Sequence, residues 1–444
     1  MSNTRKKWNV KDKFSIGFEM EMFTLDRKGN IVHEGDTIIS ETKRNFKEVF
    51  VTKEAGKHMF EIGSNPASDM RKSFGDLTHN LGRVWEIAQK KKLLLYPFAT
   101  YPGEFHPIIN SSIWYDLQET LWGKDKFTIN GLCSGFHFHF SIPQKVFAKK
   151  QKVLEPKSNR KEQDSFISCY NFLIAADPVT TTFMQSSPFI QGRYLAKDSR
   201  MLFYRGGENL NYNGLWHDFQ IFGGLQSYAQ TVTDIAKLIE KRYDIFKSQL
   251  IHWGFDPKLI SKYARRLDVA WNPVKVNKHG TYEQRGMDMN LPSYALGVSL
   301  LLKYSLKRII NEKLEVVPSD TGIYKPFKLE GNKLYIPPIN VVQQELQYLS
   351  ATEGLANGKI HRYCKSLYNF AFNGANEGAK KMAKRLSEML TEKKTVSDNL
   401  IEEIKKAGVD SVDGHINKKT AAKLAEKWSY DFLDDIEYTQ KLLE

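Results

Sequence analysis

Cysteine is scarce in this chain, and its pattern excludes a disulfide framework. Only three cysteines occur among 444 residues, Cys133, Cys169 and Cys364, and none forms a CxxC pair. An odd number of widely separated cysteines is typical of a protein that folds under reducing conditions. We therefore expect a cytoplasmic location.

Long apolar runs are also missing. No stretch approaches the roughly 20 residues that a membrane-spanning helix needs. The first residues, MSNTRKKWNVKDK, lack the apolar core of a signal peptide. We expect neither a membrane span nor a secretory signal.

Common motifs for nucleotides, nucleophiles and nucleic acids are absent from the sequence. There is no GxxxxGKS/T phosphate loop, no GxGxxG after a predicted strand and no GxSxG elbow. Zinc-finger spacing, an aromatic ribonucleoprotein motif and a helix-turn-helix pattern are lacking as well. If the chain uses ATP, cations held by carboxylates must bind the phosphates together with arginines.

The composition is that of a folded protein with an apolar core. Hydrophobic residues make up 41% of the chain, which rules out global disorder. The net charge of +14 favours an anionic partner, but it does not select among nucleic acid, a membrane surface and small anionic substrates. The length predicts two or three domains. A shift to Lys, Glu, Ala and Leu near residue 375 divides the chain into a main domain, 1–374, and a helical C-terminal region, 375–444.

Hydrophobic periodicity predicts an α+β fold with a mainly antiparallel sheet. Apolar and polar residues alternate in the predicted strands, which are 14–25, 57–63, 127–142 and 281–287. A turn at 27–30 predicts a further short strand, IVHE at 31–34, and a lysine-rich loop is expected at 144–163. Helical spacing predicts helices at 68–93, 164–184, 227–252, 256–266 and 292–312.

The first strand carries Glu19 and Glu21 on the face opposite its apolar residues. Two carboxylates on one strand face repel each other, and the simplest interpretation is a face open to solvent. The alternative is binding of a divalent cation, because hard cations such as Mg²⁺ prefer carboxylate oxygens and offset the repulsion. For an isolated ExE pair the solvated face is somewhat favoured.

Three further segments repeat this pattern of polar residues opposite an apolar face. His137 and His139 share one face of a predicted strand, where the alternative is a pair of structural histidines. Glu61 lies within an apolar strand, seven residues after Glu54, and an ionised Glu there needs a partner or a metal. Glu283 and Arg285 share a third face, where a simple ion pair is the alternative. Each signal is weak alone, and together they indicate a metal or phosphate site.

Arginines cluster in one segment that is rich in Gly and Ser. Arg193, Arg200 and Arg205 lie within SSPFIQGRYLAKDSRMLFYRGG, which has few helix or strand signals. An anion-binding loop and a set of surface charges explain this cluster equally well.

The segments together resemble glutamate–cysteine ligase family 2, the carboxylate–amine ligases of the glutamine synthetase superfamily. The family's G-x-E-x-E strand is matched at 17–21, its acidic strand at 54–61, and its G-x-H-x-H strand at 135–139. Its S-P-F-x-x-G-R segment is matched at 187–193 and its late E-x-R strand at 283–285. The resemblance covers about residues 14–300 and implies a glutamine synthetase-like curved sheet with helices on its outer face.

The resemblance also implies roles for individual residues. Glu19, His137 and Glu283 would hold a cation on the ATP phosphates. Glu21, Glu54 and Glu61 would hold another beside the carboxylate that accepts the phosphoryl group. Arg285 would neutralise the transferring phosphoryl group, with Arg193 as a further catalytic residue. His139, Arg200 and Arg205 would contact the nucleotide.

The expected function is an ATP- and Mg²⁺- or Mn²⁺-dependent ligase that joins a carboxylate, glutamate above all, to an amine such as cysteine through an acyl phosphate. Its partners would be these small molecules, with no nucleic acid and no membrane. Two alternatives remain open. A metal-dependent hydrolase would use the same side chains without ATP turnover, and a basic nucleic-acid-binding protein would use these strands only structurally.

Overall fold

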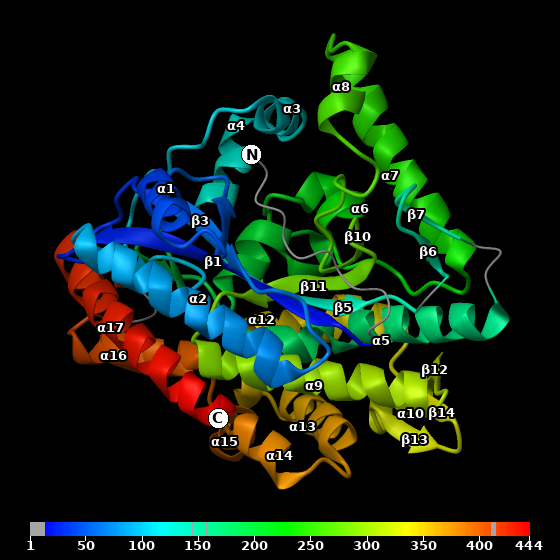
Figure 1. Ribbon diagram of the computed structural model, residues 1–444. Helices are drawn as coiled ribbons and strands as arrows, with labels where there is room; N and C mark the ends of the chain where they lie inside the picture. Colours follow the sequence, from blue (N-terminus) through cyan, green and yellow to red (C-terminus); the bar gives the residue numbers. More distant parts are fainter. Residues whose placement is uncertain (1–13, 144, 156–158, 410–413) are drawn as a thin grey trace.

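The computed structural model describes residues 14–143, 145–155, 159–409 and 414–444. Its centre is a seven-stranded antiparallel sheet with the order β10-β11-β5-β1-β3-β2, in which β4 also pairs with β1 (Figure 1). The strands are β1 (Ile16–Asp26), β2 (Phe50–Lys53), β3 (Met59–Gly63), β4 (Leu93–Tyr96), β5 (Gly135–Ser141), β10 (Val274–Asn277) and β11 (Thr281–Asp288). The predicted α+β fold with a mainly antiparallel sheet is confirmed.

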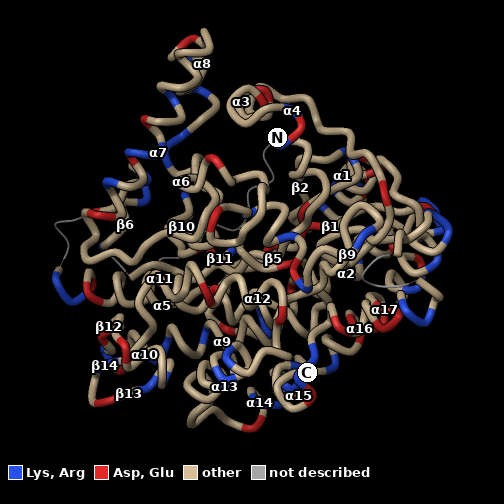
Figure 2. Tube along the Cα trace, turned by 180° about the vertical axis from the view of Figure 1, so that it is seen from behind, with Lys and Arg blue, Asp and Glu red and all other residues tan. Residues whose placement is uncertain are grey.

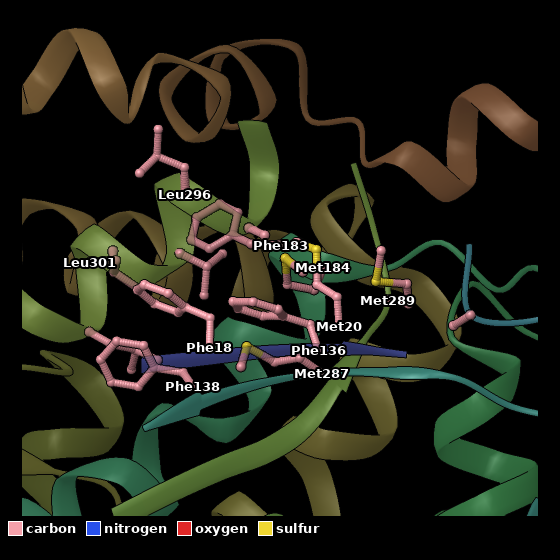
Figure 3. Packing of buried hydrophobic residues seen from close by; sticks show 14 of the residues in the cluster. Phe18, Met20, Phe136, Phe138, Phe183, Met184, Met287, Met289, Leu296 and Leu301 are labelled. Atoms are coloured by element: carbon pink, nitrogen blue, oxygen red, sulfur yellow. The ribbon is translucent and has the colours of Figure 1, made fainter. Parts of the chain in front are cut away.

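One face of the sheet is apolar because the alternating residues of each strand point to it. Phe18 and Met20 of β1 and Phe136 of β5 are fully buried on this face. Phe18 stacks on Phe136 with ring centroids 6.1 Å apart and meets Phe74 of α2 edge-on at 4.9 Å. In Figure 3 the side chains of Phe18, Met20 and Phe136 point away from the strands, toward the side on which Leu296 lies. Burying rings of this size supplies much of the hydrophobic stabilisation of the sheet.

Four long helices cover the apolar face, below the sheet in Figure 1. They are α2 (Met70–Lys90), α5 (Arg160–Met184), α9 (Pro292–Asn311) and α17 (Lys418–Leu443). The first three confirm the predicted helices at 68–93, 164–184 and 292–312 to within a few residues.

The C-terminal helices belong to the same hydrophobic core. Trp428 and Phe432 of α17 are buried in one cluster with Phe18, and Phe432 lies 6.3 Å from the Trp85 ring of α2. The predicted division of the chain at residue 375 stays a prediction.

A second set of helices lies on the other side of the sheet (Figure 1). These are α3 (Ile113–Trp122), α4 (Lys124–Thr128), α7 (Val232–His252) and α8 (Pro257–Tyr263). They pack around a second hydrophobic cluster, which includes Trp122, Trp216 and Phe246. The polar face of the sheet is therefore covered by this second set of helices.

Parts of the predicted secondary structure are wrong. The segment 31–34 contributes only a single bridge, between Leu25 and Ile31, because the helix α1 (Gly35–Asn45) starts directly after it. Residues 127–134 are not strand, since α4 and a short 3₁₀ turn precede β5. The lysine-rich segment contains a small hairpin of β6 (Phe147–Ala148) and β7 (Val153–Leu154), and residues 144 and 156–158 of that segment lie outside the described part.

Charge is spread over the molecule, and acidic and basic residues alternate along the outer helices. Figure 2 shows Lys and Arg interspersed with Asp and Glu on α7, α16 (Val396–Lys406) and α17. Among the described residues, no helix is long and apolar enough to cross a membrane.

Candidate active site

Strand pairing brings the predicted carboxylates and histidines together on the polar face of the sheet. Glu19 lies opposite His137 in the pairing of β1 with β5, and Glu21 lies opposite Glu61 in the pairing of β1 with β3. Glu283 of β11 lies opposite His139. Since side chains alternate along a strand, these residues all point to the face that the phenylalanines leave free.

His137 lies at the centre of this group. Its Nδ1 atom is 3.1 Å from Glu19 Oε2, and its Nε2 atom is 3.4 Å from Glu21 Oε1. His139 is fully buried beside it, with Nε2 at 3.2 Å from Glu19 Oε2 and Nδ1 at 3.0 Å from Thr281 Oγ1. The side chains of Glu19 and Glu21 are only 12% and 10% exposed, so the interpretation of a solvated face is wrong.

Two sets of three ligand atoms lie close enough to hold a cation. One set comes from Glu19, His137 and Glu283, and the other comes from Glu21, Glu61 and His137. Within each set the atoms lie within 4.8 Å of one another. The first set has the members that the family resemblance implies. The second contains two of the three predicted carboxylates, with His137 in place of Glu54.

Glu54 lies in the connection after β2 and not within an acidic strand as predicted. Removal from water raises the pKa of its carboxyl group well above the ordinary value, and the nearby charge of Glu21 raises it further, whereas Arg285 opposes the shift. Glu54 is therefore close to the cluster without belonging to either set of ligands.

Two cations from neighbouring strands balance part of this negative charge. Arg285 Nη1 lies 3.4 Å from Glu283 Oε1, and Lys275 Nζ of β10 lies 3.6 Å from Glu283 Oε2. Burial alone would raise the pKa of Glu283, but Lys275, Arg285 and the two histidines hold it below its ordinary value. Burial lowers the pKa of Lys275 in turn. Glu283 is thus held as a carboxylate.

The three arginines of the predicted anion-binding loop lie in different surroundings. Arg200 lines the cavity over the sheet, donates from Nη1 to the Gly286 carbonyl at 3.2 Å and lies 5.3 Å from the Tyr204 ring centroid. A Cβ at Gly135 would come within 2.6 Å of Arg200 Nη2, so a side chain at this position would displace the Arg200 guanidinium group.

Arg205 and Arg193 do not line this cavity. The guanidinium group of Arg205 forms a buried bidentate pair with Asp177 of α5, at 2.6 Å and 3.1 Å, so the predicted nucleotide contact is replaced by a structural ion pair. Arg193 is exposed in the small hairpin of β8 (Phe189–Ile190) and β9 (Arg193–Tyr194), which keeps it apart from the group.

The cavity has a volume of about 810 Å³ and two kinds of wall. Its floor is the carboxylate–histidine face of the sheet. Its other wall is aromatic, and its residues come from α3, α4, α8 and the loops around them. They include Trp114, Tyr115, Phe127, Tyr263 and Trp271. Neither this wall nor Lys275 was predicted from the sequence, because the wall has no local pattern and Lys275 lies in the four-residue strand β10.

The donor set fits a hard divalent cation. The cavity is lined by the carboxylates Glu19, Glu21, Glu54, Glu61 and Glu283, and Mg²⁺ and Mn²⁺ take carboxylate ligands. The Nε2 atom of His137 is buried and has no hydrogen-bond partner among the residues that the structure describes. A bound cation would satisfy this nitrogen and reduce the repulsion between the carboxylates.

This sheet, with its enclosed carboxylate–histidine cluster, is that of a ligase family. The chain belongs to glutamate-cysteine ligase family 2, whose profile matches residues 15–343.

Solved structures share the fold at low sequence identity. A glutamate–cysteine ligase from Francisella tularensis, in complex with AMP, has a TM-score of 0.59 at 13% identity, and the match covers 98% of this chain and 93% of that one. A bifunctional glutathione synthetase from Pasteurella multocida has a TM-score of 0.52 at 14% identity, and the match covers 95% of this chain and 52% of that one. The chain thus spans about half the length of the second protein. A search of curated protein sequences found no match.

Proposed function

We propose that this ligase activates an amino-acid carboxylate, that of glutamate above all, by phosphorylation with ATP and then transfers the acyl group to an amine. The observation that carries this proposal is the pair of three-ligand sets, Glu19–His137–Glu283 and Glu21–Glu61–His137, side by side in one cavity. Phosphoryl transfer needs positioned charge more than covalent catalysis, and this cavity supplies such charge.

Divalent cations would bind through these two sets of ligands. When bound, Mg²⁺ or Mn²⁺ neutralises phosphate oxygens and draws the two anionic substrates together. Lys275, Asn277 and Arg285 surround Glu283 with hydrogen-bond donors, which favours the triphosphate at that end of the cavity.

The reaction would proceed in two balanced steps. First, a carboxylate oxygen bonds to the γ-phosphorus of ATP while the bond to the bridging oxygen breaks, which releases ADP. Next, the amine nitrogen bonds to the acyl carbon, the C–O bond to phosphate breaks, and inorganic phosphate leaves with that electron pair. The nitrogen loses a proton to phosphate or water. Arg285 is placed to stabilise charge on the phosphoryl oxygens, because it shares a strand face with Glu283.

Hydroxylamine tests this proposal without knowledge of the natural amine. With ATP, Mg²⁺ and a panel of amino acids that includes glutamate, the enzyme should form an acyl hydroxamate together with one ADP per product. The reaction should stop in EDTA, and Glu283→Gln should lower its rate at least 100-fold. As a matched control, Asp435→Asn changes a buried carboxylate of α17 outside the cavity and should leave the rate of the folded enzyme unchanged.

Two outcomes would contradict the proposed function. Hydroxamate formation in metal-free buffer would remove the role of the cation sites. Metal-dependent cleavage of ester or amide substrates without consumption of ATP would instead favour a hydrolase.

A further inference from the structure

Two carboxyl groups lie side by side in the core, outside the residues that line the cavity. Asp198 is 1% exposed and Asp288, the last residue of β11, is fully buried, and neither belongs to a set of cation ligands. One hydroxyl group reaches both: Ser187 Oγ donates to Asp288 Oδ2 at 2.6 Å and lies 3.5 Å from Asp198 Oδ1. Asp198 and Asp288 thus form an aspartate pair.

Each member of the aspartate pair has one oxygen bound by the backbone and one oxygen left over. Asp288 Oδ2 accepts from the Ser186 amide at 2.9 Å, and Asp198 Oδ1 accepts from the Met201 amide at 2.7 Å. The other oxygens, Asp288 Oδ1 and Asp198 Oδ2, are buried and accept no hydrogen bond from an N–H or hydroxyl group that the structure describes. A hydrogen bond joins the two side chains. A single proton between the two remaining oxygens satisfies both of them.

The charged groups around the aspartate pair favour one negative charge and not two. Among the described residues, the titratable groups that act on it are Arg200, Arg205 and Cys133. The Arg205 guanidinium group is already bound to Asp177, and burial raises the pKa of the Cys133 thiol, so that thiol stays neutral. Arg200 is left as the counter-charge. Two buried carboxylates beside one available guanidinium group repel each other strongly, so one of them keeps its proton.

Arg200 connects the aspartate pair to the cavity. Its amide donates to Ser187 Oγ at 3.2 Å, the same hydroxyl group that reaches both carboxyl groups. Its side chain is 6% exposed and lines the cavity, where Nη1 donates to the Gly286 carbonyl at 3.2 Å. That carbonyl lies in the β-bulge of β11, between Gln284 and Met287. The hydroxyl group and the bulge fix the two ends of Arg200, and the charge of the pair offsets the cost of burying its guanidinium group.

The Arg200 guanidinium group lies at the Glu21 end of the cavity. A Cβ at Gly135 would lie 2.6 Å from Arg200 Nη2, and the Gly135 amide donates to Glu21 Oε2 at 2.6 Å. Arg285 pairs with Glu283 at the other end, where donors suited to a triphosphate gather. A guanidinium group beside Glu21 therefore suits the carboxylate of an amino acid.

We propose that Asp198 and Asp288 share one proton and, as a singly charged pair, position Arg200 to bind the carboxylate of the amino-acid substrate. This inference rests on the proposed ligase function and adds two positioning residues to it. The segment 187–193 then contributes to the site through the hydroxyl group of Ser187.

Infrared spectroscopy detects the shared proton directly. Difference spectra at pH 7 between the wild type and Asp198→Asn, and between the wild type and Asp288→Asn, should each contain the carbonyl band of one protonated carboxyl group. In either variant an amide hydrogen takes the place of the proton, and the remaining carboxyl group ionises. The inference is overturned if the wild type lacks this band or if only one of the two variants loses it.

Removing the charge of the aspartate pair tests its link to Arg200. In the hydroxylamine assay, the double variant Asp198→Asn/Asp288→Asn should have a kcat/KM for the amino acid about 10-fold below that of either single variant, with the KM for ATP within about twofold. In an Arg200→Met background the same double substitution should change that kcat/KM by less than about twofold, because the guanidinium group through which the pair acts is gone.

A purely structural role gives a different pattern. The full loss would then persist in the Arg200→Met background, or the KM for ATP would rise as much as that for the amino acid, and either result overturns the inference. Asp435→Asn is the matched control, since it changes a buried carboxylate of α17 and should leave the KM for the amino acid unchanged. If the double variant does not fold, the infrared spectra of the single variants still decide.

The two proposals fail in different ways. If no hydroxamate forms with any amino acid, the proposed function fails, whatever the infrared spectra show. If hydroxamate forms and the infrared band is missing, only this inference fails.

Discussion

Replacing Glu61 with glutamine should stabilise the protein in the absence of cations and remove most of its response to them. Glu61 lies directly opposite Glu21 in the pairing of β1 with β3. Its ligand atom lies within 4.8 Å of those of Glu21 and His137. Like charges on facing strand positions destabilise a sheet, so the cation-free enzyme carries a cost that the variant Glu61→Gln relieves.

The magnitude follows from this distance. Two unit charges 4.8 Å apart repel by about 3.5 kcal/mol at an effective dielectric constant of about 20. Arg285 and the Gly135 amide, which donates to Glu21 Oε2 at 2.6 Å, offset part of this repulsion. A net gain of about 1–2 kcal/mol remains, which corresponds to a rise of about 1–2 °C in the melting temperature of a chain of this length.

Thermal denaturation in EDTA and in Mg²⁺ measures both effects. Mg²⁺ at about 100 times its dissociation constant should stabilise the wild type by about 2.7 kcal/mol and the variant by much less. The control Asp435→Asn removes a buried carboxylate that accepts from the Ser293 amide at 2.7 Å. It should lower the melting temperature and keep the full Mg²⁺ response. If Glu61→Gln melts below the wild type in EDTA, or responds to Mg²⁺ as the wild type does, the reasoning about repulsion is refuted.

Three further predictions concern other side chains. Arg285→Lys should lower kcat roughly 100-fold with little change in the KM for ATP, because an ammonium group cannot contact two phosphoryl oxygens as a guanidinium group does. If the folded fraction of the variant turns over at a near-normal rate and only its melting temperature falls, Arg285 has a structural role. Burial, assisted by His33, lowers the pKa of His58 to about 3 from 6.5, so below pH 6.5 the unfolded chain takes up a proton that the folded chain does not. Stability should therefore fall by roughly 1.4 kcal/mol per pH unit between pH 6 and 4, as urea titrations can measure, and a slope no shallower in His58→Gln would exclude this cause. Arg205→Met should cost about 3–5 kcal/mol in urea unfolding because it leaves Asp177 buried without its partner, and the double variant with Asp177→Leu should recover much of that loss.

The sequence predicted the floor of the site well because one local rule governs it. Alternation with period 2 assigns Glu19 and Glu21 to one face, and the same rule applies to His137 and Glu283. Strand pairing then needs only the correct order of strands to bring these residues together. The strands β2, β4 and β10 were not predicted, because each has only four residues and so few residues hardly establish a period.

The aromatic wall could not be predicted in the same way. Trp114 and Tyr115 lie on α3, and Trp271 lies in the segment before β10. These side chains meet only after their segments pack over the sheet, and the spacing of residues within each segment does not predict that contact. For Arg205 the sequence predicted a ligand contact where the structure has an ion pair. Its partner Asp177 lies within α5, and no sequence pattern indicates that this carboxylate is buried in the core.

A single imidazole is shared by both sets of cation ligands, and this makes the two sets unequal. His137 presents Nδ1 toward Glu19 and Nε2 toward Glu21. A neutral imidazole has one lone pair for a ligand, and its other nitrogen carries a proton. The ring can therefore ligate only one cation at a time, and a cation in the other set would be held by the two carboxylates of that set. Loading of the two positions is coupled through the movement of one proton, so titrations with Mg²⁺ should reveal two unequal affinities and not two independent sites.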